Sequence, residues 1–394
     1  MKWPITTIGK VCISTSQKDP SKTHNEGWFR YVDIAGIDRS SKIISSAKQV
    51  PCSEAPSRAR KVLKTDDVLV SMVRPNLNAV AQVPKDLDGE IASTGFSVLR
   101  ANPKLVNPKF LFYRTQHRDF IDYLVSKCTG QSYPAVSDEI IRNAPISLPP
   151  LSEQERIVEI LEEANRIRRL RKEANQKAEK IIPALFLKMF GDPETNPKGW
   201  KIQHIKDVVL STDYATSSKA SSDGLGLPII RMGNIDYEGR LDLKDLKYIQ
   251  LEHAEIERLS LKAGDILFNR TNSKELVGKT GLWDGGIEAV PASYFIRVRV
   301  NPDIITPCFL WVFMNSNHMK KLLFSTARGA IGQANINSRE LKDFSIFIPL
   351  IDKQKLFENM LEKIKRLIHH QSESLLKSEN LFSMLLMQSF SGRK

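Results

Sequence analysis

The sequence predicts an α+β protein in which two repeated α/β domains are separated by two long helices that form an antiparallel coiled coil with pseudo-two-fold symmetry. Three observations support this prediction. Landmark residues recur at a nearly constant spacing, each copy passes from strand-like to helical segments in the same order, and each copy ends in a long stretch without glycine. The chain then divides into a first domain (1–150), a first helical spacer (151–191), a second domain (192–350) and a second spacer (351–394).

The internal repeat has a period close to 200 residues, and such a period sets the fold before any local feature does. The shift between matched residues grows along the copy only from 197 to 200, as small loop insertions would produce. The matched landmarks, in chain order, are Trp3 with Trp200, Ile8 with Ile205, Asp67 with Asp265, Phe110 with Phe309, Gly130 with Gly329, and Gln154 with Gln354.

Each copy begins with short apolar runs broken by Pro, Gly, Asn and Asp, which is typical of strands and loops. In the first copy, residues 67–73 and 95–99 predict strands and residues 109–126 predict a helix. In the second copy, residues 265–268 and 293–300 predict strands, and a helix is expected around residues 309–325. The same order of elements therefore indicates two copies of one domain.

Apolar residues in the two spacers alternate in steps of three and four, which is the pattern of a coiled-coil seam. If Arg171 lies beside Gln371 in an antiparallel pair, Ile157 lies near Leu385. The alternative is two separate amphipathic helices, each packed on its own domain, and Pro183 is expected to kink or end the first helix. The predicted pairing residues are Ile157, Ile160, Ile167, Arg171, Ala174, Ala178 and Ile181 in the first helix, and Phe357, Met360, Ile364, Leu367, Gln371 and Leu385 in the second.

The composition favours a polyanionic partner. Lysine and arginine outnumber aspartate and glutamate by 58 to 45, giving a net charge of +13 and a pI of about 9.4, and nucleic acid is the first partner that such a balance indicates. An ordinary basic cytosolic protein is the alternative. The four cysteines form no CxxC pair and predict free thiols, and no signal peptide or membrane span is recognisable, so a soluble cytoplasmic protein is expected.

Two copies related by an antiparallel helix pair would share an approximate two-fold axis, and double-stranded DNA presents half-sites with matching symmetry. The helices would then set the distance between the half-sites. Because the two copies differ in most residues, the two halves of the recognised sequence should differ as well. The expected target is therefore asymmetric and split.

Several motifs resemble the specificity subunits of type I restriction-modification systems, over essentially the whole chain. They are the Trp-x-x-x-x-Ile starts, the segments DDVLVSMVRPNLN, GDILFNRTNS and ASTGFSVLR, the exits ISLPPLSEQERIVEIL and IFIPLIDKQKLFENML, and the ends LFLKMFGD and LLMQSFSG. The resemblance implies two target recognition domains. It also implies assembly with two methyltransferase subunits and with restriction subunits that move along DNA, and it assigns AdoMet, ATP and magnesium to those partners.

The sequence carries no motif for chemistry of its own. It has no HExxH or Cys/His metal spacing, no G-x-x-x-x-G-K-[ST] loop and no Asn/Asp-Pro-Pro-Tyr/Phe element. We therefore expect a non-catalytic chain without a cofactor. The alternatives are a specificity subunit of a related methylation-based phage-defence or type II-like system, a stand-alone restriction enzyme or methyltransferase, and a transcriptional regulator with two DNA-binding domains.

Polar loops marked by Gly or Pro occupy corresponding places in both copies and are the predicted DNA contacts, since Arg, Lys, Asn, Gln and Ser read bases and hold phosphates. Alternatively, their Asn and Gly residues only build turns. A basic run in the first spacer (166–172) is interpreted as a solvated face, with DNA or partner contact as the alternative. The candidates are Arg74, Asn76, Asn78, Lys127, Gln131, Ser132 and Tyr133 in the first copy, and Arg270, Asn272, Ser273, Lys274, Arg328, Gln333 and Asn335 in the second.

Overall fold

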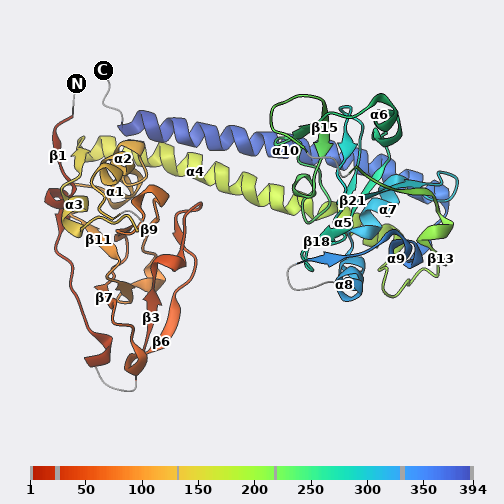
Figure 1. Ribbon diagram of the computed structural model, residues 1–394. Helices are drawn as coiled ribbons and strands as arrows, with labels where there is room; N and C mark the ends of the chain where they lie inside the picture. The colour runs from red at the N-terminus through yellow and green to blue at the C-terminus, as the bar shows by residue number, and fades with distance from the viewer. Residues whose placement is uncertain (1–2, 23–26, 131–132, 217–219, 329–332, 391–394) are drawn as a thin grey trace. The chain divides into compact units, whose positions relative to one another are not determined.

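The computed structural model describes residues 3–22, 27–130, 133–216, 220–328 and 333–390. The chain forms two compact units, the first from residues 1–173 and 373–394 and the second from residues 174–372 (Figure 1). Each unit therefore combines one copy of the repeat with the beginning of one long helix and the end of the other. The units are described separately below.

An antiparallel sheet in the order β2-β11-β8-β9 forms the centre of the first unit. Its middle strand β8 is buried on both faces: Val68 and Val70 pack on the core that contains α1 and α2, whereas Leu69 packs on a separate core toward the second sheet. A continuous apolar run is typical of such a strand. The strands are β2 (Cys12–Ile13), β11 (Phe96–Ala101), β8 (Val68–Ser71) and β9 (Val80–Gln82).

A second sheet, in the order β6-β3-β10-β7, lies at the end of the first unit away from α1 and α2 (Figure 1). Within it, β3 and β10 are parallel. Its strands are β6 (Lys48–Pro51), β3 (Trp28–Val32), β10 (Ile91–Ser93) and β7 (Ala59–Val62). Two strand pairs complete the unit, β1 (Ile5–Thr7) with β12 (Pro145–Ser147) and β4 (Ile37–Asp38) with β5 (Ile43–Ile44).

The predicted helix over residues 109–126 is two helices, α1 (Pro108–Arg114) and α2 (Arg118–Ser126), followed by α3 (Asp138–Arg142). The break occurs because His117 is extended and its imidazole accepts a hydrogen bond from the Asp119 amide, which caps α2. The second unit repeats this break between α7 (Pro307–Met314) and α8 (Asn317–Thr326), where Ser316 is the cap.

The second unit repeats the strand order of the first, except that no described strand of the second sheet corresponds to β7. The antiparallel sheet β14-β21-β17-β19 corresponds to β2-β11-β8-β9, and β16-β15-β20, with β15 and β20 parallel, corresponds to β6-β3-β10. The predicted duplication of one α+β domain is thus confirmed. The strands are β14 (Val209–Tyr214), β21 (Phe295–Val300), β17 (Ile266–Asn269), β19 (Thr280–Leu282), β16 (Lys247–Ile249), β15 (Leu227–Ile230) and β20 (Val290–Pro291).

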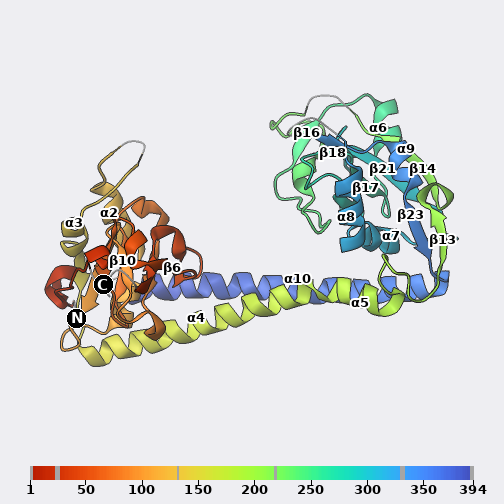
Figure 2. The ribbon, with the colours of Figure 1, turned by 90° about the horizontal axis from the view of Figure 1, so that it is seen from below.

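The remaining elements of the second unit also follow the first. Strands β13 (Lys201–His204) and β23 (Ser345–Ile348) pair at one edge, as β1 and β12 do, and α7 lies beside α5 (Ile181–Phe190) (Figure 2). Helix α9 (Ser338–Asp343) corresponds to α3. The unit also contains α6 (His253–Leu259) and the short pair β18 (Thr271–Asn272) with β22 (Ala334–Asn335).

The first long helix is α4 (Leu151–Glu179), and α5 continues it after Lys180. The interruption has a direct cause, because Pro183 lacks an N–H and its ring crowds the carbonyl four residues earlier, at Glu179. The second long helix, α10 (Ile351–Phe390), has no proline and is continuous.

A buried glutamine fixes the beginning of each long helix to its own unit. The Gln154 carboxamide accepts the N–H of Asn107 (2.8 Å) and donates to the carbonyls of Leu105 (3.1 Å) and Pro149 (2.8 Å). Gln354 makes the corresponding bonds with Thr306, Ile304 and Pro349, at 2.9, 3.1 and 2.8 Å. The landmark glutamines of the sequence repeat are therefore structural anchors.

Within each unit, the ends of the long helices pack on shared apolar cores. In the second unit, the Phe357 ring lies 5.9 and 5.3 Å from those of Phe186 and Phe190, while Ser372 donates to Asn175 (3.1 Å). The two helices therefore run antiparallel in that unit. In the first unit, Ile157 and Leu385 belong to one apolar cluster, as the predicted pairing requires. A coiled coil that is continuous through both units stays a prediction.

The residues that are buried along the long helices differ from the predicted seam at several positions. Ile157 and Phe357 are buried as predicted, but Ile160 is 39% exposed whereas the next residue, Leu161, is fully buried. Ile160 and Leu161 are adjacent and both apolar. The predicted spacing of three residues from Ile157 leads to Ile160, which is the exposed residue of the two. The other predicted residues that lie exposed are Ile167, Arg171, Ile181, Met360 and Leu367, and those that are half-buried are Ala174, Ala178, Ile364, Gln371 and Leu385.

Candidate functional site

The structure brings the two predicted loops of the first unit together. The Arg74 amide donates to the carbonyl of Pro134 (2.7 Å), the Val136 amide donates to that of Met72 (2.9 Å), and Val73 forms a β-bridge with Ala135. The loop that follows β8 and the loop that follows α2 therefore form one surface, which we call the first loop pair (residues 72–78, 127–130 and 133–136). Gln131 and Ser132 belong to the predicted site but lie outside the described residues.

Most predicted side chains of the first loop pair face solvent. Arg74, Asn76 and Lys127 are exposed, and Tyr133 is 71% exposed. The guanidinium carbon of Arg74 lies 5.2 Å from the centre of the Tyr133 ring, which is a cation–π contact. A charged, planar donor group is thus held at the surface by an aromatic ring.

Asn78 has a different environment from its neighbours. It is only 9% exposed, and its amide nitrogen donates to the carbonyl of Thr115 (2.8 Å) while its side-chain oxygen accepts from Lys42 (2.8 Å). Burial, ahead of repulsion by Arg168, lowers the pKa of Lys42 to about 8. In this conformation Asn78 supports the loop and does not present its amide to a ligand.

The second unit joins its two predicted loops in the same way. Thr271 pairs with Asn335 in the β18–β22 ladder, the Arg270 amide donates to the carbonyl of Tyr294 (2.8 Å), and the Ile336 amide donates to that of Arg270 (2.9 Å). We call this surface the second loop pair (residues 270–274, 328 and 333–336). Both copies therefore place the same two loops side by side.

Several side chains of the second loop pair contact neighbouring residues. The Arg270 guanidinium lies 4.8 Å from the centre of the Tyr214 ring, and Lys274 lies 4.7 Å from that of Phe324. The Asn272 side chain donates to Asn269 (3.0 Å) and accepts the Ser273 amide (2.9 Å).

Three further predicted residues complete the second loop pair. Arg328 is exposed and lies 3.6 Å from a carboxylate oxygen of Glu340, and Gln333 is exposed. The Asn335 side chain donates to the Thr271 hydroxyl (3.3 Å). Arg328 and Gln333 are therefore the most accessible of the predicted side chains here, together with Lys274.

The two loop pairs correspond as loops, but their arginines do not correspond. Met72 and Arg270 make the same two backbone hydrogen bonds, with Gly95 and Val136 in the first unit and with Tyr294 and Ile336 in the second. The structural counterpart of Arg74 is therefore Asn272, two residues beyond Arg270. The two surfaces thus present different donors and acceptors at the same place.

Tyr214 and Phe324 contact predicted residues of the candidate site but were not predicted from the sequence. Tyr214 precedes Arg270 by 56 residues and comes beside it only because β14 and β17 both flank β21. Its hydroxyl also accepts the amide of Ser338. The exposed Phe324 ends the apolar face of α8, and a large exposed aromatic near a basic loop is the signal that could have identified it.

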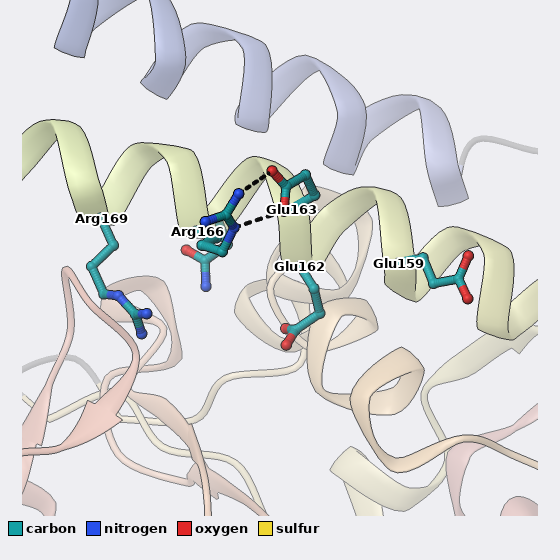
Figure 3. A pocket seen from close by; sticks show the side chains of 6 residues that line it. Glu159, Glu162, Glu163, Arg166 and Arg169 are labelled. Carbon is teal, nitrogen blue, oxygen red and sulfur yellow. Dashed lines mark hydrogen bonds and ion pairs between the residues drawn. The ribbon is translucent and has the colours of Figure 1, made fainter.

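Two arginines of the basic run of α4 pair with glutamates within the first unit. Arg166 makes two hydrogen bonds with Glu163 (2.7 and 2.8 Å), and Arg169 lies 3.9 Å from Glu173. Figure 3 shows a shallow hollow on this helix, lined by Glu159, Glu162, Glu163, Asn165, Arg166 and Arg169. Arg168 instead covers the ring of Phe382 at 4.3 Å. This mixture of charges favours a solvated or protein-contacting face over a DNA-contacting one.

Within the described ranges, no group of three or more His, Cys, Asp or Glu side chains could hold a metal ion. The described helices also include none that is both long and apolar enough to cross a membrane.

Comparisons with known proteins agree on one family. The model of the type I restriction modification DNA specificity domain matches twice, over residues 3–180 and 197–378. The type I restriction enzyme EcoKI specificity subunit of Escherichia coli K12 is 21% identical over 84% of this chain and 75% of its own length. A putative MjaX specificity subunit of Methanocaldococcus jannaschii is 28% identical, but the match covers 44% of this chain and only 41% of that relative.

One solved structure covers 99% of this chain and 97% of its own, with 26% identity and a TM-score of 0.66. It comes from work on the complex assembly and conformational transition of the type I R-M system.

Proposed function

The chain belongs to the family of the type I restriction modification DNA specificity domain, and we propose that it is the DNA-recognition subunit of a type I restriction-modification complex. Each unit would recognise one half of a split, asymmetric DNA sequence. The observation that carries this proposal is the recurrence of one loop pair, formed by the same backbone bonds, on two copies of one fold. Matched loops that carry different side chains suit two unlike half-sites.

Charge supports DNA as the ligand. The chain carries a net charge of +13, and counterion release from DNA phosphates favours binding by such a protein. The predicted contacts Arg74, Lys127, Lys274 and Arg328 are exposed cations on the loop pairs. We assign phosphate or base contact to them, and to the exposed Asn76 and Gln333.

The helices suit a role as a spacer between the half-sites. Helix α10 has 40 residues, which is about 60 Å at about 1.5 Å per residue. Nearly two turns of DNA, at about 34 Å each, have a comparable length. Antiparallel pairing along this length would fix the number of base pairs between the halves.

We further propose that two methyltransferase subunits and restriction subunits assemble on this chain, and that AdoMet, ATP and magnesium act in those partners. The chain itself would carry no catalytic group, and its DNA substrate would place the complex in the cytoplasm. Among the alternatives, a DNA-binding regulator would occupy its site without any partner subunit.

Reconstitution with the cognate methyltransferase subunit tests this function. The chain, the methyltransferase subunit and both together would be incubated with DNA and AdoMet, and methylated adenines would be mapped. We expect methylation only by the mixture, at a sequence with two specified blocks and an unspecified gap. Methyl transfer by this chain alone, or a single uninterrupted recognition sequence, would contradict the proposal.

A further inference from the structure

Arg74 has a backbone that is clamped in an uncommon conformation. Its φ of 49° and ψ of 61° lie in the left-handed region, which non-glycine residues seldom adopt and which concentrates at functional sites. The amide of Arg74 donates to the carbonyl of Pro134 (2.7 Å), and its carbonyl accepts the amide of Leu77 (2.9 Å). Both backbone groups of this residue are therefore fixed, and so is the direction in which its side chain leaves the loop.

The side chain of Arg74 is exposed, contacts an aromatic ring and has no acidic partner among the described residues. Its guanidinium lies 5.2 Å from the centre of the Tyr133 ring, and in the described part of the chain no carboxylate comes within ion-pair distance of it. Arginines such as Arg30, Arg100 and Arg142, by contrast, bind carboxylates. A ring contact on the guanidinium leaves its N–H edge available.

That edge has the geometry for one particular base. A guanidinium presents two parallel N–H donors, and guanine presents O6 and N7 as two adjacent acceptors in the major groove. We propose, on the basis of the function proposed above, that Arg74 reads a guanine in the half-site bound by the first unit, with Tyr133 as the residue that positions it. An arginine that already contacts a ring loses less side-chain freedom on binding than a free one, which favours discrimination between bases.

At the place that corresponds to Arg74, the second unit has no exposed arginine against an aromatic ring. Asn272 is the counterpart of Arg74, and its amide is already engaged by Asn269 and by the Ser273 backbone. Arg270, which is two residues before Asn272, lies over the Tyr214 ring and is half-buried. The guanine contact of Arg74 therefore belongs to one half-site alone.

The test uses the full chain in complex with its methyltransferase subunit. Competition binding at one fixed salt concentration would compare duplexes in which each base pair of the recognised site is replaced in turn. The variants are Arg74→Lys, which keeps the charge but loses the paired donors, and Tyr133→Leu. Arg118→Lys, an exposed arginine on α2, is the matched control.

We expect Arg74→Lys to reduce discrimination at one G·C pair by about 10- to 100-fold, the range of one bidentate base contact, with binding to unrelated DNA changed less than about twofold. Tyr133→Leu should weaken discrimination partially at that same base pair, and Arg118→Lys should change nothing. A uniform loss of affinity for all sequences would indicate a phosphate contact and overturn the inference.

Unchanged discrimination in Arg74→Lys would also overturn the inference while leaving the proposed function intact. A wild-type complex without any sequence preference would instead overturn the proposed function, and this inference with it.

Discussion

Replacing Gln154 by leucine should loosen the attachment of α4 to the first unit. The side chain is fully buried, and leucine has a similar size but no polar atoms. The change leaves the N–H of Asn107 and the carbonyls of Leu105 and Pro149 without their partner. Each buried backbone group that loses its hydrogen bond costs about 1–3 kcal/mol.

The full cost for all three groups is not expected, because a small shift of the helix end lets water bind some of them. We therefore expect a loss of unfolding free energy of about 3 kcal/mol, near the lower limit of the sum. At roughly 2–4 °C per kcal/mol for a domain of 150–250 residues, the melting temperature of the first unit should fall by about 6–12 °C.

Thermal unfolding would measure the change, and hydrogen exchange at residues 104–108 would locate it. Gln354→Leu should produce a loss of similar size, confined to the second unit, because its hydrogen bonds match those of Gln154. Gln176→Ala, an exposed glutamine on the same helix, serves as the control. A shift below about 2 °C in both buried variants would refute the reasoning.

Three further predictions concern stability. Leu161→Ala should cost about 2–5 kcal/mol whereas Ile160→Ala should cost under about 1 kcal/mol, and equal losses in urea unfolding would argue against the observed seam. Burial, and next the charge of Arg114, lower the pKa of His117. The unfolded chain therefore binds the proton more readily, and stability should fall as the pH drops through about 6.5. His117→Gln should flatten this dependence in urea unfolding between pH 5 and 7. Asp67→Ala removes the buried carboxylate that pairs with Arg100 and should cost about 3–5 kcal/mol of unfolding free energy in the same assay. A loss below about 1 kcal/mol would show that the pair contributes little.

The duplication could be predicted from the sequence because its landmarks are residues with fixed structural tasks. Gln154 and Gln354 anchor helices, and Asp67 and Asp265 bind arginines at matched places, Arg100 and Arg299. Such buried polar contacts tolerate few substitutes, so their spacing stays readable where the surrounding residues differ.

Other features depend on contacts that the linear sequence does not contain. The choice between Ile160 and Leu161 as the buried residue is set by the neighbouring helices and domain, because both are apolar and adjacent. Likewise, only the sheet order brings Tyr214 beside Arg270. Asn78 has the residue type of a DNA contact, but Lys42 and Thr115 engage its amide.

Exchange of one domain tests the central claim most directly. Residues 1–150 would be replaced by the corresponding domain of another family member, and methylated adenines would be mapped for the original and hybrid complexes. Independent recognition predicts that one block of the methylated sequence changes while the other block and the gap between them stay the same. A hybrid that alters both blocks would contradict the division of recognition between the two units.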